Sequence, residues 1–193
     1  YITGAFPSNP LEGSIFPDTY FFLRDVNAST LIKRMQTRMN QKLDEVWKGN
    51  YKFFKSKNDL LIMASLIEAE AKKSEEKYMV SSVFHNRLKK NMKLQSDPTI
   101  LYVKNLQKNK NKSFKIYKKD LQSDNPWNTY TRKGMPISPI CNPGLDAIKA
   151  AANPYITDLL FFVSDGEGGH RFSRTLEEHR KNINLWKKKN EKK

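Results

Sequence analysis

The stretch Leu60-Leu-Ile-Met-Ala-Ser-Leu-Ile-Glu-Ala-Glu-Ala71 is almost entirely apolar apart from one serine and two glutamates. Such a run, from about Asn58 or Asp59 to Lys72, predicts a helix that is apolar on nearly every side. A helix of this kind must be covered by other elements. The sequence therefore predicts one central, buried helix around which the rest of the domain is assembled.

Two carboxylates interrupt this apolar helix, at Glu68 and Glu70. Residues two positions apart on a helix differ by about 200° of rotation, so these side chains point to opposite sides and cannot form a close dyad. One would face a cleft and the other solvent or a partner. Burial raises the pKa of a carboxyl group, which suits a general acid near neutral pH. The alternative, still open, is one surface glutamate and one glutamate paired with a lysine.

Further helices and strands are predicted on both sides of this segment. A strand is predicted at residues 19–23, and an amphipathic helix at about residues 29–47, capped by Asn27 or Ser29. After the central helix, Ser74 opens a third helix that continues to about Lys90.

The C-terminal part alternates helical and extended patterns. Asn142-Pro143-Gly144 caps a short alanine-rich helix, because proline suits the first helical position. Residues 161–172 read as a hairpin with a glycine-rich turn, and Thr175 with Glu178 forms a capping box for the last helix. That helix is expected to dissolve into a lysine-rich tail, residues 187–193. The prediction is α+β: a helix-dominated domain, residues 1–186, with a small antiparallel hairpin.

Composition limits the classes of protein that remain. The chain has 193 residues, and 35 Lys+Arg against 20 Asp+Glu give a net charge of +15. A single cysteine, Cys141, excludes an internal disulfide, and no apolar run reaches the roughly 18 residues of a membrane span. Most of the basic excess is lysine mixed with asparagine, which fits either a solvated surface or an anionic partner. The chain starts at Tyr1 without a signal peptide, so we expect a fragment of a longer protein.

Short polar loops supply further candidate site residues. They contain amides, hydroxyls and aromatic rings, a mixture more typical of a carbohydrate cleft than of a phosphate or metal site. The candidates are Gln95, Ser96, Asp97, Asn128, Tyr130 and Asn142. His170 lies beside the glycine-rich turn and joins them, whereas His85 is expected in packing and His179 on a helix surface. No phosphate loop, metal-spaced histidine pair or serine elbow is present, so no metal or cofactor is expected.

Seven of these segments resemble, in order, the motifs of the YceG-like endolytic murein transglycosylases. Leu11-Glu-Gly-Ser-Ile-Phe-Pro-Asp-Thr-Tyr20 resembles the family signature EG-x-x-F-P-D-T-Y, and the central helix resembles its A-S-I-I-E-K-E pattern. The others are residues 80–88, 94–99, 128–130, 142–144 and 162–172. The similarity extends from about residue 11 to residue 186. Ala69 departs from the usual Lys or Arg between the paired glutamates, and the lysine-rich connection at residues 103–120 is longer than usual.

The resemblance implies a lytic transglycosylase that cleaves the MurNAc–GlcNAc bond inside peptidoglycan strands and leaves 1,6-anhydro-MurNAc ends. It implies that Glu70 is the catalytic acid and base, with Glu12 and Glu68 as candidate second carboxylates. It also places the seven polar residues named above, Gln95 to His170, in substrate binding. Such enzymes are usually held in the cell membrane by one N-terminal helix, with a LysM-like module and the catalytic domain outside the cytoplasm. Peptidoglycan strands and a peptidoglycan synthase are the implied partners.

Two alternatives to catalysis remain on the sequence alone. The same cleft could hold glycan without cutting it, or the basic surface could bind nucleic acid, although we expect no nucleic-acid partner. The lysines at residues 104–119 and in the tail are expected to act through their electric field and not through specific contacts.

Overall fold

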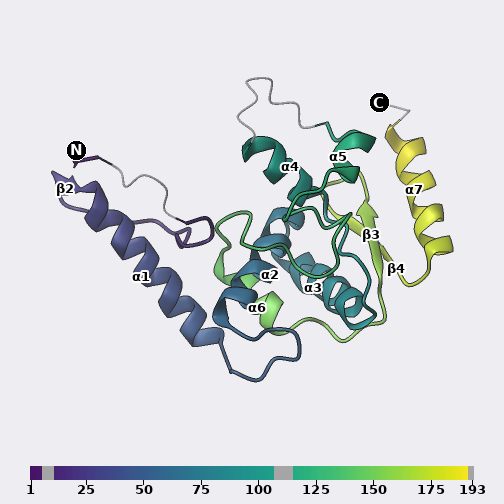
Figure 1. Ribbon diagram of the computed structural model, residues 1–193, viewed down its shortest axis with the longest axis horizontal. Coiled ribbons are helices and arrows are strands. Elements are labelled where there is room, and N and C mark those ends of the chain that lie inside the picture. The colour runs from purple at the N-terminus through teal and green to yellow at the C-terminus, as the bar shows by residue number, and fades with distance from the viewer. Residues whose placement is uncertain (6–10, 107–114, 191–193) are drawn as a thin grey trace.

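Helix α2 (Lys57–Glu70) lies at the centre of this computed structural model, which describes residues 1–5, 11–106 and 115–190 (Figure 1). Every residue from Leu60 to Ile67 is buried, so the predicted central helix is confirmed. The helix begins slightly earlier than predicted, because Ser56 caps it and forms a capping box with Asp59.

Two helices cover α2. The alanine-rich α6 (Leu145–Ala152) buries Ala147, Ala150 and Ala151 against it, and these small side chains let the two backbones approach closely. Its N-cap is Gly144, so it begins at Leu145 and not at Pro143. Helix α3 (Ser74–Lys89) starts at the predicted serine and is tied to α6 by polar contacts. The His85 Nε2 lies 2.9 Å from the Ala151 carbonyl oxygen, which confirms its role in packing.

The N-terminal part forms a long helix along one side of the fold. Helix α1 (Ala28–Val46) is capped by Asn27, whose side chain accepts a hydrogen bond from the Ser29 backbone N–H at 2.9 Å. Just before it, β2 (Val26–Asn27) pairs in parallel with β1 (Ile2–Thr3).

The strand predicted at residues 19–23 is wrong. Within the described ranges this segment pairs with no other strand, and Phe21 and Leu23 are 85% and 87% exposed. Its aromatic composition is typical of a strand, but a strand also needs a neighbouring backbone to satisfy its hydrogen bonds. The parallel pairing next to this segment is made by residues 26–27, which pair with Ile2–Thr3.

Residues 94–99 are only partly a turn. Asp97 is the first residue of helix α4 (Asp97–Leu106), and a second short helix, α5 (Lys118–Gln122), follows. Lys104 of α4 forms an ion pair with Asp120 of α5 at 3.0 Å. The lysine-asparagine run at residues 108–112, to which part of the charge prediction applies, lies outside the described residues.

The predicted hairpin is confirmed. Strands β3 (Phe161–Ser164) and β4 (His170–Ser173) pair antiparallel, with Ser164 opposite His170. The capping box is also confirmed: the Glu178 backbone N–H donates to Thr175 Oγ1 at 3.2 Å, at the start of helix α7 (Leu176–Asn190). This helix packs beside the hairpin (Figure 1) and continues to Asn190, so lysines 187–189 are helical and are not a frayed tail.

Helices dominate and the sheets have two strands each, so the α+β class is confirmed. None of the helices in the described ranges is both long and apolar enough to cross a membrane.

Candidate active site

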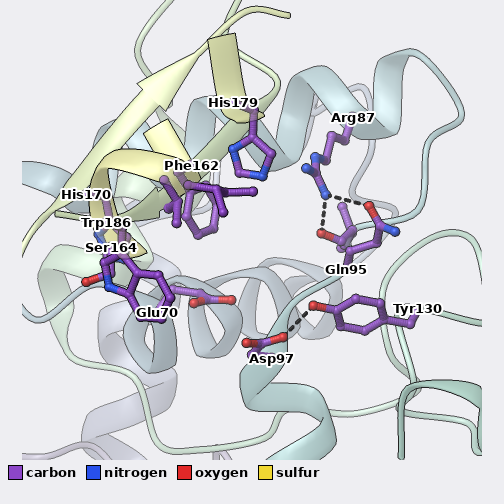
Figure 2. A pocket seen from close by; sticks show the side chains of 13 residues that line it. Glu70, Arg87, Gln95, Asp97, Tyr130, Phe162, Ser164, His170, His179 and Trp186 are labelled. Atoms are coloured by element: carbon purple, nitrogen blue, oxygen red, sulfur yellow. Dashed lines mark hydrogen bonds between the residues drawn. The ribbon is translucent and has the colours of Figure 1, made fainter. Parts of the chain in front are cut away.

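A pocket of about 590 Å³ opens where the end of α2 meets the hairpin, α7 and the loop before α4. Its lining mixes aromatic, aliphatic and polar side chains: Glu70, Arg87, Leu94, Gln95, Asp97, Tyr130, Phe162, Val163, Ser164, His170, His179, Ile183 and Trp186. Figure 2 shows the Glu70 carboxylate between Trp186 on one side and the Asp97–Tyr130 pair on the other. The pocket thus brings together residues far apart in the sequence.

Glu70 is the last residue of α2, and its environment favours the protonated carboxyl group. Burial raises its pKa to about 7, and the negative charge of Asp97 acts in the same direction. The negative end of the α2 dipole also disfavours a charge there. The Ser96 hydroxyl, which donates to Glu70 Oε1 at 2.6 Å, and the Arg87 charge act in the opposite direction. The outcome is a carboxyl group that can both donate and accept a proton near neutral pH.

Arg87 of α3 fixes the backbone around the acid. Its Nε donates to the Leu160 carbonyl at 2.6 Å, and its Nη1 donates to the Leu94 carbonyl at 2.7 Å. The guanidinium therefore joins the segment leading into the hairpin to the loop before α4. Among the described residues that line the pocket, Arg87 is the single Lys or Arg, and its Nε and Nη1 are held by these carbonyls.

The loop before α4 is held in an unusual conformation. Gln95 has a φ of 51°, in the left-handed region that few non-glycine residues adopt. Its backbone N–H donates to the Thr129 carbonyl at 3.1 Å, and the Ser96 N–H donates to Thr129 Oγ1 at 2.9 Å. These contacts point the Ser96 hydroxyl at Glu70.

Tyr130 and Asp97 form a second polar pair in the pocket. The phenol donates a short hydrogen bond to Asp97 Oδ1. Burial raises the pKa of Tyr130, and its contact with Asp97 raises it further, so the phenol stays neutral. Asn128 lies behind this pair: its side chain donates to the Ser123 carbonyl at 2.8 Å and accepts from the Tyr130 N–H at 2.8 Å. Asn128 is buried and positions Tyr130 without lining the pocket.

The two glutamates of α2 point to opposite sides, as predicted. Glu68 pairs with Lys77 at 3.0 Å and accepts a hydrogen bond from the Gly144 N–H at 3.1 Å, away from the pocket. Glu70 therefore faces the pocket and Glu68 is the lysine-paired carboxylate, while neither of them is the surface glutamate of the alternative. Glu12 and Asn142 also lie outside the lining, and Asn142 Oδ1 accepts from the Ile15 N–H at 3.1 Å.

His170 lines the pocket, as its place beside the glycine-rich turn suggested, and Glu76 binds its imidazole. His179 lines it as well, where a surface position was predicted.

The sequence did not indicate Arg87 or the pocket face of α7, which consists of His179, Ile183 and Trp186. The spacing of four and then three residues between His179, Ile183 and Trp186 places their side chains on one helix face and could have indicated this part of the pocket. Among the residues described, no group of His, Cys, Asp or Glu is arranged to hold a metal ion.

These features define an α+β domain with a carboxyl group of raised pKa in a pocket lined by aromatic and polar side chains. The chain belongs to the YceG-like family, whose model matches residues 3–185.

Named relatives agree with this family. The chain is 42% identical over 175 residues to an endolytic murein transglycosylase of Bacillus subtilis, and 34% identical over 178 residues to one of Streptococcus pneumoniae. In each case the match covers 90% of this chain, but it spans only 47% and 32% of those relatives. A crystal structure of a YceG-like protein from Listeria monocytogenes is similar with a TM-score of 0.76 and 39% identity. That match covers 88% of this chain and 54% of the Listeria chain.

Proposed function

We propose that this chain is the catalytic region of an endolytic murein transglycosylase and that Glu70 is its acid and base. The observation that carries the proposal is the Glu70 carboxyl group, with a pKa raised to about 7, in a pocket lined by aromatic and polar side chains. The names of the relatives support the same activity. The substrate is then a peptidoglycan strand.

One carboxyl group suffices for this reaction. Protonated Glu70 gives its proton to the glycosidic oxygen as the bond from that oxygen to C1 of MurNAc breaks. The resulting carboxylate then takes the proton from the 6-hydroxyl of the same MurNAc, whose oxygen bonds to C1 and closes the 1,6-anhydro ring. The proton returns to Glu70 and water is not consumed. A pKa near the working pH makes both transfers favourable.

The other residues divide into two roles in this proposal. Gln95, Asp97, Tyr130 and His170 line the pocket and contact sugar hydroxyl and acetamido groups. Ser96 holds Glu70, while Asn128 and Asn142 position loops from behind. Glu68 is assigned to the α2–α3 ion pair and Glu12 to the N-terminal segment, outside the reacting groups.

Asp97 is the carboxylate that a rival hydrolytic mechanism would use. A glycosidase needs a second carboxylate to activate water or to attack C1. Asp97 is the other acidic side chain of this pocket, but its Oδ1 already accepts the Tyr130 hydrogen bond. Transglycosylation leaves that hydrogen bond intact, which is why we favour it.

Digestion of purified peptidoglycan in water labelled with the heavy isotope oxygen-18, followed by mass spectrometry of the products, tests the proposal. We expect anhydro ends without heavy oxygen, whereas a hydrolase would leave reducing ends that carry it and a binding module would leave the glycan intact. Glu70→Gln should lower the rate by about a hundredfold or more. Glu68→Gln is the matched variant on the opposite side of α2 and should retain turnover. A dead Glu68→Gln with an active Glu70→Gln would overturn the assignment.

Placement at the cell membrane and contact with a peptidoglycan synthase are further parts of the proposal. They follow from the family resemblance and concern the longer protein. Crosslinking of that protein in cells, followed by isolation of membranes, would test both.

A further inference from the structure

Helix α7 contributes three side chains to the pocket although none of its residues is fully buried. His179, Ile183 and Trp186 lie on one face of the helix, because they are spaced by four and three residues. A face of this kind normally packs against a protein core. Here it borders open pocket volume.

Contacts on either side of Trp186 fix α7 to the hairpin. Near its start, the His179 ring stacks on Phe161 with centroids 5.1 Å apart. Near its end, Lys189 forms an ion pair with Glu167 in the β3–β4 turn and also reaches the Asp165 carbonyl at 3.3 Å. Trp186 is therefore carried on a helix anchored at both ends.

The other two tryptophans pack against aromatic side chains of the domain, whereas Trp186 does not. Trp47 packs on Tyr51 at 5.1 Å, and Trp127 packs on Tyr102 and donates its indole N–H to Ser138 Oγ at 2.9 Å. In the described part of the chain, the Trp186 ring has no aromatic partner and its N–H has no acceptor. A half-buried indole with both an apolar face and a free donor is suited to an amphipathic ligand.

We propose that Trp186 is a stacking platform for a sugar ring next to the bond that Glu70 cleaves. The inference rests on the proposed function and adds a specificity-determining residue to it. A pyranose ring has an apolar face of C–H groups that packs on an indole, and hydroxyls at its edge that accept the indole N–H. The surroundings suit an uncharged sugar ring, since Arg87 is the single Lys or Arg among the described lining residues and its Nε and Nη1 donate to backbone carbonyls.

The test uses the chain with Glu70→Gln, which removes the acid proton but keeps the side-chain shape, and incorporates fluorotryptophan. Substituting each tryptophan in turn by phenylalanine assigns the three fluorine resonances. A peptide-free glycan oligomer of alternating GlcNAc and MurNAc is then titrated, with saturation judged by calorimetry. We expect the Trp186 resonance to shift on binding while those of Trp47 and Trp127 stay in place.

Affinity provides the second measurement. Trp186→Ala in the Glu70→Gln background should weaken glycan binding by about tenfold, whereas Leu185→Ala should leave it unchanged. Leu185 is the matched control because it is the neighbouring residue, is 51% exposed and does not line the pocket. If Trp186→Ala fails to fold, the fluorine titration still decides.

An unshifted Trp186 resonance at saturation, or unchanged affinity of a folded Trp186→Ala chain, would overturn the inference. The failure of the proposed function looks different, because the unsubstituted chain would then release no anhydro ends. If the unsubstituted chain releases anhydro ends but the Trp186 resonance does not shift, the stacking role of Trp186 is wrong and the proposed function stands.

Discussion

Both oxygens of the Glu76 carboxylate bind His170. Oε1 accepts the His170 backbone N–H at 3.1 Å, and Oε2 lies 2.7 Å from its imidazole Nδ1. Glu76 belongs to the first turn of α3 and His170 begins β4, so this contact joins the hairpin to the helical body. Gly169 makes the approach feasible, because a Cβ at that position would lie 2.5 Å from Glu76 Oε1. A neutral imidazole bound in this way carries its proton on Nδ1 and leaves Nε2 as an acceptor.

Replacing Glu76 by alanine is expected to change the tautomer of His170. Without the carboxylate, the neutral ring should shift toward the form protonated on Nε2, and kcat should fall because the pocket then meets a donor in place of an acceptor. Nitrogen NMR of the imidazole distinguishes the two forms. Glu75→Ala is the matched control, since Glu75 is the exposed neighbour in the same turn. Gly169→Ala should reproduce the tautomer change by displacing the carboxylate, and an unaltered tautomer in both variants would contradict this role for Glu76.

Ser96→Ala is expected to move the alkaline side of the pH–rate profile to higher pH. The Ser96 hydrogen bond lowers the pKa of Glu70, so its removal lets the acid stay protonated further into the alkaline range. A hydrogen bond worth roughly 1 kcal/mol corresponds to a shift of somewhat less than one pH unit. The measurement is kcat/KM against pH on a peptidoglycan substrate. A shift toward lower pH would show that Ser96 stabilises the protonated acid instead.

Asp97→Asn is expected to shift the same profile in the opposite direction. The Asp97 charge raises the pKa of Glu70, so an amide at this position lowers it and the rate falls off at lower pH. The variant should still release anhydro ends, because the proposed reaction uses only Glu70 for proton transfer. Mass spectrometry of its products checks this. Complete loss of turnover over the whole pH range, with the fold intact, would favour the two-carboxylate hydrolytic mechanism.

Glu70→Gln should stabilise the protein at alkaline pH and have little such effect in acid. Since burial raises the pKa of Glu70 from 4.5 to about 7, the folded state keeps a proton that the unfolded state has released between these values. The free energy of unfolding of the unsubstituted chain therefore falls as pH rises through this window. The variant does not titrate there, so its advantage should grow to on the order of 3 kcal/mol above about pH 7.

Urea unfolding of both chains at about pH 4 and about pH 8 measures this difference. Glu75→Gln serves as the control for loss of an exposed carboxylate on the neighbouring helix. A gap between Glu70→Gln and the unsubstituted chain that stays constant with pH would mean that the pKa of Glu70 is the same in the folded and unfolded states, and the proposed raised pKa would then be wrong.

The local features of the chain were predictable because they depend on neighbouring residues. The apolar run of α2 required burial, and the two-residue spacing of Glu68 and Glu70 required opposite directions, and both predictions are confirmed. The hairpin at Phe161–Ser164 and His170–Ser173 followed from its glycine-rich turn in the same way.

The wrong strand prediction and the pocket residues that were not predicted both depend on contacts between segments far apart in the sequence. Residues 19–23 have the composition of a strand, but in the described ranges no other strand pairs with them, which their composition alone does not reveal. Arg87 reads as an ordinary arginine on the third predicted helix, and only the folded chain shows that it binds the Leu94 and Leu160 carbonyls. His179 and Trp186 lie on a helix with no fully buried residue, so composition alone assigns them to the surface.

Because α7 packs on the hairpin, the residues that set the proton affinity of Glu70 and the residues that form the outer wall of the pocket belong to different parts of the fold. The proton affinity of Glu70 depends on its position at the end of α2, a helix whose buried residues Leu60 to Ile67 pack in the core with α6. The outer wall of the pocket, with Trp186, belongs to α7, which packs on the hairpin, so substitutions there should act independently of the α2–α6 packing. Under the proposed function, variation in α7 would therefore change which glycan strands bind, while the proton transfers assigned to Glu70 stay the same.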